Sequence, residues 1–232
     1  MQQKIVVFTG AGVSAESGIQ TFRDGDGLWE NHDIQQVATP EAWNENPKLV
    51  LDFYNARRKQ VLKAKPNEAH QSLVLLEQNF DVQIITQNID DLHERAGSKK
   101  VLHLHGEILK TRSTFDDELY DWKKPELKLG DKCPKGYQLR PHVVWFGEPV
   151  PNMIEAAKVC EDAALLIVIG TSLNVYPAAN IVNFVPTNCT KYLIDPKKPA
   201  SFLENNIKFI QKKAGEGVAE LVKQLLSLEE KV

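Results

Sequence analysis

Short apolar runs recur along the chain, each four or five residues long and most of them rich in valine and isoleucine. Runs of this length that do not alternate with polar residues are typical of strands buried on both faces of a sheet. They are Ile5–Thr9, Val82–Thr86, Val101–Leu104, Val143–Phe146, Leu165–Ile169, Lys191–Ile194 and Ile207–Ile210. We expect these segments to form a buried sheet.

Stretches with helical character separate several of these runs. Asn67–Gln78 carries its apolar residues on one stripe, and Met153–Ala164 has a helical composition. A final helix is marked by Val218, Leu221, Val222 and Leu225. Because strand and helix alternate, the strands should run parallel. The expected fold class is α/β, a Rossmann-like parallel sheet with helices on both faces.

Two stretches break the alternation and indicate a smaller inserted module. Asn46 and Pro47 are a cap and a first-turn residue for an extra helix that runs to about Lys63. Residues 107–140 are polar and irregular, with several proline and glycine breakers. We expect residues 1–30, 66–106 and 142–232 to form the nucleotide-binding domain, and 31–65 and 107–141 to form the module.

Length and composition fit one large domain that carries a smaller module. The chain has 232 residues, of which 42% are hydrophobic and 25% charged, as in ordinary globular domains. Its net charge of −3 and the lack of long same-sign runs argue against nucleic acid or an anionic membrane as partner. No apolar run is long enough for a signal peptide or a membrane span, and the cysteines are three and widely spaced, so a cytoplasmic location is expected.

A glycine-rich loop follows the first expected strand directly. Gly10, Ala11, Gly12, Val13, Ser14 and Ala15 match the spacing G-x-G-x-x-G/A of dinucleotide phosphate loops. An ordinary strand-to-helix turn is the alternative interpretation. The loop then continues through residues 18–29 where a helix is expected, and loops of that length in compact domains are usually functional.

Polar and small residues also follow three later strands. Gln87–Asp90 comes after the second strand, His103 and His105 end the third, and Gly170–Ser172 ends a later one. Singly, each fits a turn, a helix cap or a hydrogen-bonded structural histidine. Jointly they predict a ligand site, because open α/β sheets bind ligands at the carboxyl ends of their strands.

These segments together resemble a known family. Five segments resemble, in order and spacing, the motifs of the sirtuins, which are NAD-dependent protein lysine deacylases: Gly10–Arg23, Thr86–Asp90, His103–Glu107, Trp145–Glu148 and Gly170–Leu173. The resemblance extends from about residue 4 to residue 225, nearly the whole chain. It implies that NAD is the co-substrate and that the partners are acylated-lysine proteins or peptides. It specifies no oligomeric state.

The resemblance also implies roles for individual residues. The pyrophosphate would lie on Gly10, Ala11, Ser14 and Arg23. The nicotinamide ribose would contact Gln87, the carboxamide Asn88 and Asp90, and Phe22 would cover the anomeric carbon. Adenosine would lie on Gly170, Ser172, Asp195 and Ala214. The remaining cofactor-binding residues would be Gly12, Ala15, Ile19, Trp29, Ile89 and Thr171.

The same resemblance makes His105 and Asn88 the catalytic residues. The acyl-lysine oxygen would attack the anomeric carbon, and His105 would accept a proton from a ribose hydroxyl. An imidazole with an ordinary pKa near 6.5 is largely neutral at cytoplasmic pH, as a base must be. His103 is expected to be structural. Val144, Phe146 and Gly147 would offer strand edges to the substrate peptide.

The extra helix carries a candidate determinant of acyl specificity. Tyr54 and Arg57 are three positions apart, so they lie on one helical face. By themselves they read as a partly buried tyrosine beside a solvated arginine. In the context of the family they resemble the Tyr-x-x-Arg feature of the sirtuins that prefer succinyl- and malonyl-lysine. A guanidinium and a phenol suit a carboxylate and offer nothing to an acetyl group.

One departure from the family pattern concerns metal. Sirtuins generally carry four zinc-binding cysteines in the inserted module, but residues 107–140 contain only Cys133 and no histidine. A structural zinc site needs four nitrogen or sulfur ligands, so we expect no structural zinc. Ser113 stands about where a first thiolate would be. Packing of Phe115, Leu119, Tyr120 and Trp122 is expected to hold the module instead.

Three other functions compete with deacylation. A mono-ADP-ribosyltransferase shares the chemistry at the ribose and differs in the mass of its product. An NAD dehydrogenase lacks support because no acidic residue follows the second strand at the usual place. A non-catalytic NAD-responsive binding protein has no need of His105 and Asn88, both of which are present.

Overall fold

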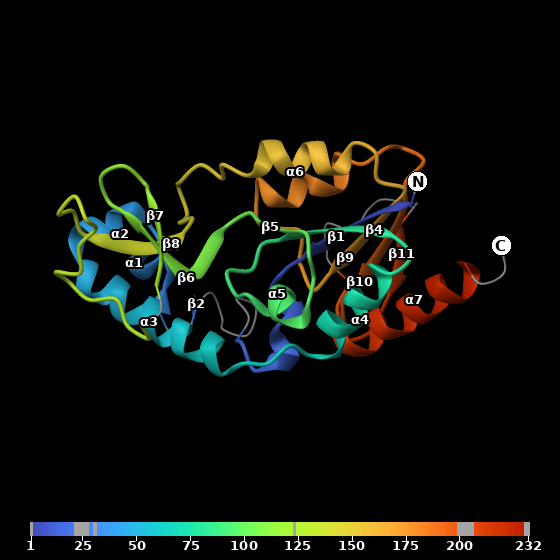
Figure 1. Cartoon of the computed structure of the whole chain (residues 1–232), viewed down its shortest axis with the longest axis horizontal. Coiled ribbons are helices and arrows are strands. Elements are labelled where there is room, and N and C mark those ends of the chain that lie inside the picture. Colours follow the sequence, from blue (N-terminus) through green and yellow to red (C-terminus); the bar gives the residue numbers. More distant parts are fainter. Residues whose placement is uncertain (1, 21–27, 30–31, 123, 199–206, 230–232) are drawn as a thin grey trace.

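A six-stranded parallel sheet forms the centre of the molecule (Figure 1). The computed structural model describes residues 2–20, 28–29, 32–122, 124–198 and 207–229. The strand order is β11-β10-β9-β1-β4-β5. The strands are β1 (Lys4–Thr9), β4 (Asp81–Thr86), β5 (Val101–His103), β9 (Leu165–Ile169), β10 (Thr190–Ile194) and β11 (Ile207–Ile210). The α/β fold class expected from the sequence is confirmed.

Helices cover both faces of this sheet, because alternate side chains of its strands point to opposite sides. On β1, Ile5 and Val7 join the core under α4 (Glu68–Leu76) and α7 (Ala214–Glu229). Val6 and Phe8 join the core under α6 (Met153–Cys160) and the 3-10 helix η3 (Ala178–Asn183). Figure 1 shows the two layers above and below the sheet.

Asparagine caps start two of the helices where the sequence predicts them. The side chain of Asn46 accepts a hydrogen bond from Leu49 N at 3.1 Å, which starts α3 (Pro47–Lys63). Asn67 caps α4, and its Nδ2 also donates to Val13 O at 2.8 Å and Ser17 Oγ at 3.0 Å. The start of α4 is therefore tied to the glycine-rich loop.

The other short elements connect these parts. They are η1 (Ala11–Val13), η2 (Ala15–Ser17), β2 (Leu28–Trp29), β3 (His32–Asp33), α1 (Ile34–Val37), α2 (Pro40–Glu45) and α5 (Leu92–Ala96). Where a Rossmann helix would follow the glycine-rich loop, the chain makes the two 3-10 turns η1 and η2. No helix in the described part of the chain is long and apolar enough to cross a bilayer.

The inserted module contains a small antiparallel sheet that the sequence analysis missed. Its order is β7-β6-β8, with β6 at Gly106–Ser113, β7 at Leu119–Asp121 and β8 at Leu139–Val143. The interpretation of 107–140 as irregular was therefore wrong. The prediction of a buried strand at Val143–Phe146 in the main sheet was also wrong, because the strand in this region is β8, which lies in the small sheet. β6 mixes buried with partly buried residues, and the mostly buried β8 contains Arg140, Pro141 and His142, so neither strand presents a continuous apolar run.

A separate apolar cluster holds the module together beside α3. Its buried members are Leu51, Leu127, Cys133 and Leu139. Tyr120 and Trp122 pack against the cluster, as expected. Phe115 and Leu119 do not, because they are 64% and 47% exposed, so their expected role in the core was wrong.

Candidate active site

The predicted site residues line one cavity of about 620 Å³ between the carboxyl edge of the parallel sheet and the module. Those that line it are Gly10, Ala11, Gly12, Ser14, Ala15, Ile19, Tyr54, Arg57, Gln87, Asn88, Ile89, Asp90, His105, Val144, Phe146, Gly147, Gly170, Thr171, Ser172, Asp195 and Ala214. Phe22 and Arg23 lie outside the described residues. Of Trp29 only the backbone is described, in β2.

The glycine-rich loop is packed directly against the loop that follows β9. Gly12 N donates to Gly170 O at 2.9 Å, and Gly10 N donates to Ile169 O at 3.0 Å. A Cβ atom at Gly12 would lie 2.6 Å from Gly170 Cα, which is closer than atoms can approach. Gly170 itself has φ +61°, a left-handed conformation that favours glycine. Glycine is therefore required for the two loops to meet and form this wall of the cavity.

Asn88, Asp90 and Ser14 form a hydrogen-bonded cluster in the cavity wall. Ser14 Oγ donates to Asp90 Oδ2 at 3.0 Å, and Asn88 Nδ2 donates to Ser14 Oγ at 3.1 Å. Burial raises the pKa of the Asp90 carboxyl, although hydrogen bonds from Leu92 N and Ser14 Oγ oppose the shift. A carboxylate beside an amide can match the donors and acceptors of a carboxamide.

The hydrogen bonding of His105 leaves one ring nitrogen able to accept a proton. Its Nδ1 is 3.0 Å from Gln87 O, and a carbonyl can only accept, so Nδ1 carries the proton and Nε2 keeps its lone pair. Burial lowers the pKa of His105, against the smaller opposing effect of the Gln87 hydrogen bond. The imidazole is therefore neutral near pH 7. Gln87 is itself held by its Nε2, which donates to Thr171 Oγ1 at 3.0 Å.

Tyr54 and Arg57 both face this cavity from α3. They are only 1% and 6% exposed, so the interpretation of Arg57 as a solvated surface residue is wrong. Burial raises the pKa of the Tyr54 phenol well above its ordinary value, although the nearby Arg57 charge opposes the shift. The phenol therefore stays protonated and is a hydrogen-bond donor beside a cation.

Residues 144–147 leave β8 along the cavity and turn at Phe146 and Gly147. Val144 N donates to His105 O at 2.9 Å, and Phe146 N donates to Ala38 O at 3.0 Å. The Glu148 carboxylate accepts from Trp145 N at 2.8 Å and from the guanidinium of Arg140 at 2.7 Å. These contacts fix the loop between the sheet edge and the module. Val144, Phe146 and Gly147 lie outside any strand of the structure.

Sequence reasoning missed several residues that line the cavity. They include Glu16, Ala38, Val61, Trp145, Glu148, Val175, Tyr176, Pro177, Lys197 and Lys213. Trp145 and Glu148 belong to one of the quoted motifs, and Lys213 is next to Ala214, so proximity in sequence could have identified these. Ala38 and Val61 carry no such signal, because they reach the cavity only through the packing of the module.

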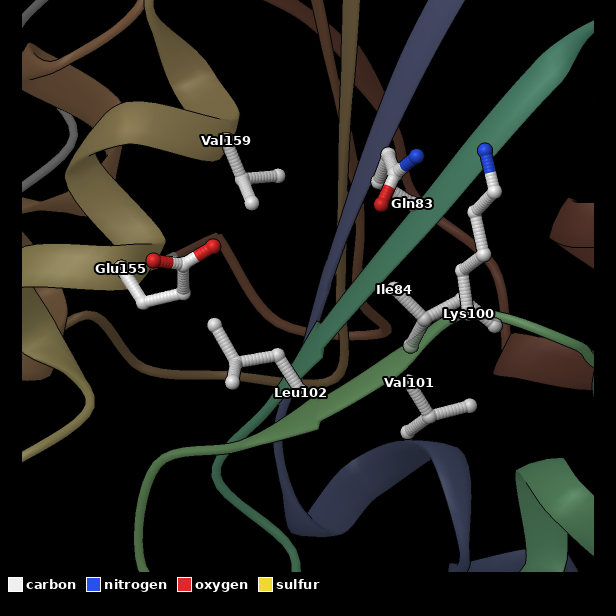
Figure 2. Close-up of a pocket in the computed structure, with 7 residues that line it drawn as sticks. All are labelled: Gln83, Ile84, Lys100, Val101, Leu102, Glu155 and Val159. Carbon is white, nitrogen blue, oxygen red and sulfur yellow. The ribbon is translucent and has the colours of Figure 1, made fainter.

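A second, smaller cavity of about 160 Å³ lies beside β4 and β5, between them and α6 (Figure 2). Two of its polar side chains, those of Gln83 and Lys100, are hydrogen-bonded to Asp81. Gln83 Nε2 donates to Asp81 Oδ1 at 3.0 Å, and Lys100 Nζ donates to the same oxygen at 2.6 Å. None of the predicted site residues lines this smaller cavity.

The module offers no cluster of metal ligands within the described part of the chain. No group of three or more histidine, cysteine, aspartate or glutamate side chains there could hold an ion. Cys133 and Ser113 do lie together, with the Cys133 Sγ donating to Ser113 Oγ at 3.7 Å. Apolar packing around Cys133 surrounds this contact.

We predict that the purified protein contains no stoichiometric zinc and that chelators change neither its melting temperature nor its activity. The reason is that the module is held by its apolar cluster and by hydrogen bonds such as Asn55 Nδ2 to Leu127 O at 2.9 Å. Elemental analysis and melting curves with and without EDTA test this. One zinc ion per chain would contradict it.

Comparison with known proteins points to one family. The model of the Sir2 family matches residues 10–177. A protein of Bacteroides thetaiotaomicron named NAD-dependent protein deacylase is 52% identical over 97% of this chain and 98% of its own length. One of the same name from Helicobacter pylori is 51% identical over 97% of this chain and 99% of its own length.

Solved structures agree with this result. A Sir2 homologue mutant in complex with ADP-ribose has a TM-score of 0.90 at 39% identity, covering 99% of this chain and 94% of its own. A Sir2 homologue in complex with NAD has a TM-score of 0.89 at 39% identity, covering 98% and 91%. The likeness therefore covers the parallel sheet and the module together.

Proposed function

Since this chain belongs to the Sir2 family and is an NAD-dependent protein deacylase, we propose that it acts preferentially on succinyl- and malonyl-lysine. The observation that carries the proposal is the buried pair of Tyr54 and Arg57 in the wall of the large cavity. An acetyl group has no charge for this pair to bind.

The cavity fits NAD as co-substrate. Its walls are the close-packed loops after β1 and β9 and the hydrogen-bonded cluster of Ser14, Asn88 and Asp90. In our proposal the loop at Gly10–Ser14 holds the pyrophosphate, and Asn88 and Asp90 hold the carboxamide. Gly170, Ser172, Asp195 and Ala214 hold the adenosine. Backbone groups at such a loop can approach phosphate closely where glycine removes the side chain.

His105 is the proposed general base, and Asn88 the second catalytic residue. When bound, NAD supplies an electrophilic ribose carbon once nicotinamide leaves. His105 Nε2 is free to accept a proton because Nδ1 is occupied by Gln87 O. The Asn88 side chain donates to Ser14 Oγ, which in turn donates to Asp90, so one hydroxyl links the two side chains.

The proposed acyl preference follows from charge and burial. A carboxylate at the end of a succinyl or malonyl chain would meet the Arg57 guanidinium and the Tyr54 phenol, which remains protonated. Charge-assisted hydrogen bonds to a carboxylate are about twice as strong as neutral ones. The low local dielectric around two buried side chains strengthens the attraction further.

Comparison of acyl groups on one peptide tests this proposal. We expect kcat/KM for succinyl- and malonyl-lysine to exceed that for acetyl-lysine by roughly tenfold or more, the effect of one charged hydrogen bond. Butyryl-lysine is the control, because it has the chain length of succinyl without the carboxylate. Higher efficiency on acetyl or butyryl than on succinyl would contradict the preference. Mass spectrometry of the products also separates deacylation from ADP-ribosyl transfer.

A further inference from the structure

His103 lies at the end of β5, beneath the active-site cavity rather than in its wall. It is 7% exposed and is not among the residues that line the cavity. Both of its ring nitrogens have partners. Nδ1 is 2.9 Å from Asn88 O, and Nε2 is 2.7 Å from Glu94 Oε1. The ring therefore bridges the loop that carries Asn88 to helix α5.

The two partners determine the charge of the ring. A backbone carbonyl can only accept a hydrogen bond, and an ionised carboxylate can only accept one as well. Two short hydrogen bonds to these acceptors require a proton on each nitrogen. His103 is therefore an imidazolium paired with the Glu94 carboxylate.

The charges around the ring agree with this assignment. The groups that face it are Glu94 and His93 on α5, Glu107 on β6 and Asp90 in the loop. Burial disfavours the imidazolium, but the hydrogen bond and charge of Glu94, the Asn88 carbonyl and the charge of Glu107 together outweigh it, so the pKa of His103 is raised. Burial likewise disfavours the Glu94 carboxylate, yet the His103 hydrogen bond leaves the pKa of Glu94 lowered.

His105 differs from His103 in charge although it is only two residues away. It has one carbonyl partner, Gln87 O, and no carboxylate partner among the described residues. The two imidazoles thus hold consecutive carbonyls of the chain, those of Gln87 and Asn88. One is kept neutral and able to accept a proton, while the other is charged. Surroundings that shift the pKa values of two neighbouring titratable groups in opposite directions give the two groups different roles.

Three hydrogen bonds restrain Asn88, and the one from His103 is the only one of the three with a charged donor. Asn88 N donates to Thr86 Oγ1 at 3.0 Å, and its side chain donates to Ser14. The hydrogen bond from the imidazolium to Asn88 O is charge-assisted and so stronger than either. Loss of it would allow the peptide between Asn88 and Ile89 to rotate.

We propose that His103, held as an imidazolium by Glu94, is a positioning residue that fixes Asn88 for the deacylase reaction. The proposal rests on the role of Asn88 given under Proposed function. It does not depend on the acyl preference, so all tests use an acetyl-lysine peptide. Failure of the succinyl preference would leave it unaffected.

Nuclear magnetic resonance of the histidine rings tests the charge. We expect both nitrogens of His103 to carry protons at pH 7.5 in the wild type. In Glu94→Gln the pKa of His103 should fall by about one unit or more, because the carboxylate is gone. A neutral His103 ring at pH 7.5 in the wild type would overturn the proposal.

Kinetics test the positioning. His103→Leu should lower kcat about 10- to 100-fold, the effect of one charged hydrogen bond, with little change in KM for the peptide. His103→Asn should recover part of kcat, because its amide can donate from the position of Nδ1. Unchanged kcat in His103→Leu would overturn the proposal. So would equal losses in the two variants, since a purely structural role predicts no rescue.

If His103→Leu does not fold, the pH dependence of kcat in Glu94→Gln still tests the proposal. The Glu94 side chain is 39% exposed and glutamine has the same shape, so we expect this substitution to leave the fold intact. The imidazolium is present below its pKa and is lost as pH rises through it. A lower pKa in Glu94→Gln should therefore move the alkaline fall of kcat to lower pH. Glu155→Gln on α6 is the matched control and should retain the wild-type profile; superimposable profiles for wild type and Glu94→Gln would refute the proposal.

Discussion

Replacement of His105 by alanine or tyrosine is expected to abolish turnover while leaving NAD binding nearly intact. The imidazole Nε2 is the proposed acceptor of a ribose proton, and general bases contribute about 10²- to 10⁴-fold to rate. The proposed NAD contacts come from the other walls of the cavity, so the affinity for NAD measured by calorimetry should change little. Undiminished kcat in either variant would remove His105 from the mechanism.

The pH dependence of the wild type provides a second measurement on the same group. Burial lowers the pKa of His105 below the ordinary value of 6.5. Because the base must be neutral, activity should be present above that lowered pKa and be lost as pH falls through it. The acid limb of kcat/KM should therefore lie below pH 6.5.

Arg57→Met and Tyr54→Phe should depress desuccinylation selectively. Each charged hydrogen bond contributes about 1.5 to 3 kcal/mol, so loss of Arg57 should lower kcat/KM for succinyl-lysine roughly ten- to a hundredfold. Deacetylation should change little, because an acetyl group makes no contact that needs the charge. Steady-state kinetics on paired acetyl and succinyl peptides measure both effects.

A control variant on the same helix distinguishes a specific loss of desuccinylation from a general loss of activity. Lys63 is an exposed cation in the last turn of α3, so Lys63→Met removes a positive charge away from the cavity. It should leave both activities unchanged. Equal losses on the two substrates in Arg57→Met would mean that the arginine supports the fold of the cavity wall and not the acyl group.

The active-site edge of the sheet could be predicted from the sequence for a physical reason. Strands buried on both faces appear as continuous apolar runs, and polar or small residues that follow them must lie at one edge. The ends of β1, β4 and β9 were found in this way, and their residues do line one cavity. The Asn46 cap located α3 just as directly.

The module could not be predicted in the same way. In β6 the polar residues Glu107, Lys110 and Arg112 interrupt the buried positions, and β8 contains Arg140 and Pro141, so neither strand appears as an apolar run. The cation–π contact of Arg140 over Trp145, at 3.2 Å from the ring centroid, joins residues whose partnership has no sequence periodicity. Contacts of this kind are known only once the chain is folded.

The contact between the glycine-rich loop and Gly170 has a consequence for biosynthesis. Gly12 emerges from the ribosome early, whereas the carbonyl that accepts its hydrogen bond belongs to the loop after β9, far along the chain. β1 lies between β4 and β9, so a nascent chain that ends before β9 has only one neighbour for its central strand. The cavity wall made by these two loops therefore forms only after β9 and Gly170 have been synthesised. If NAD binds against this wall as proposed, its stabilising effect on a nascent chain should begin only once the chain extends past Gly170.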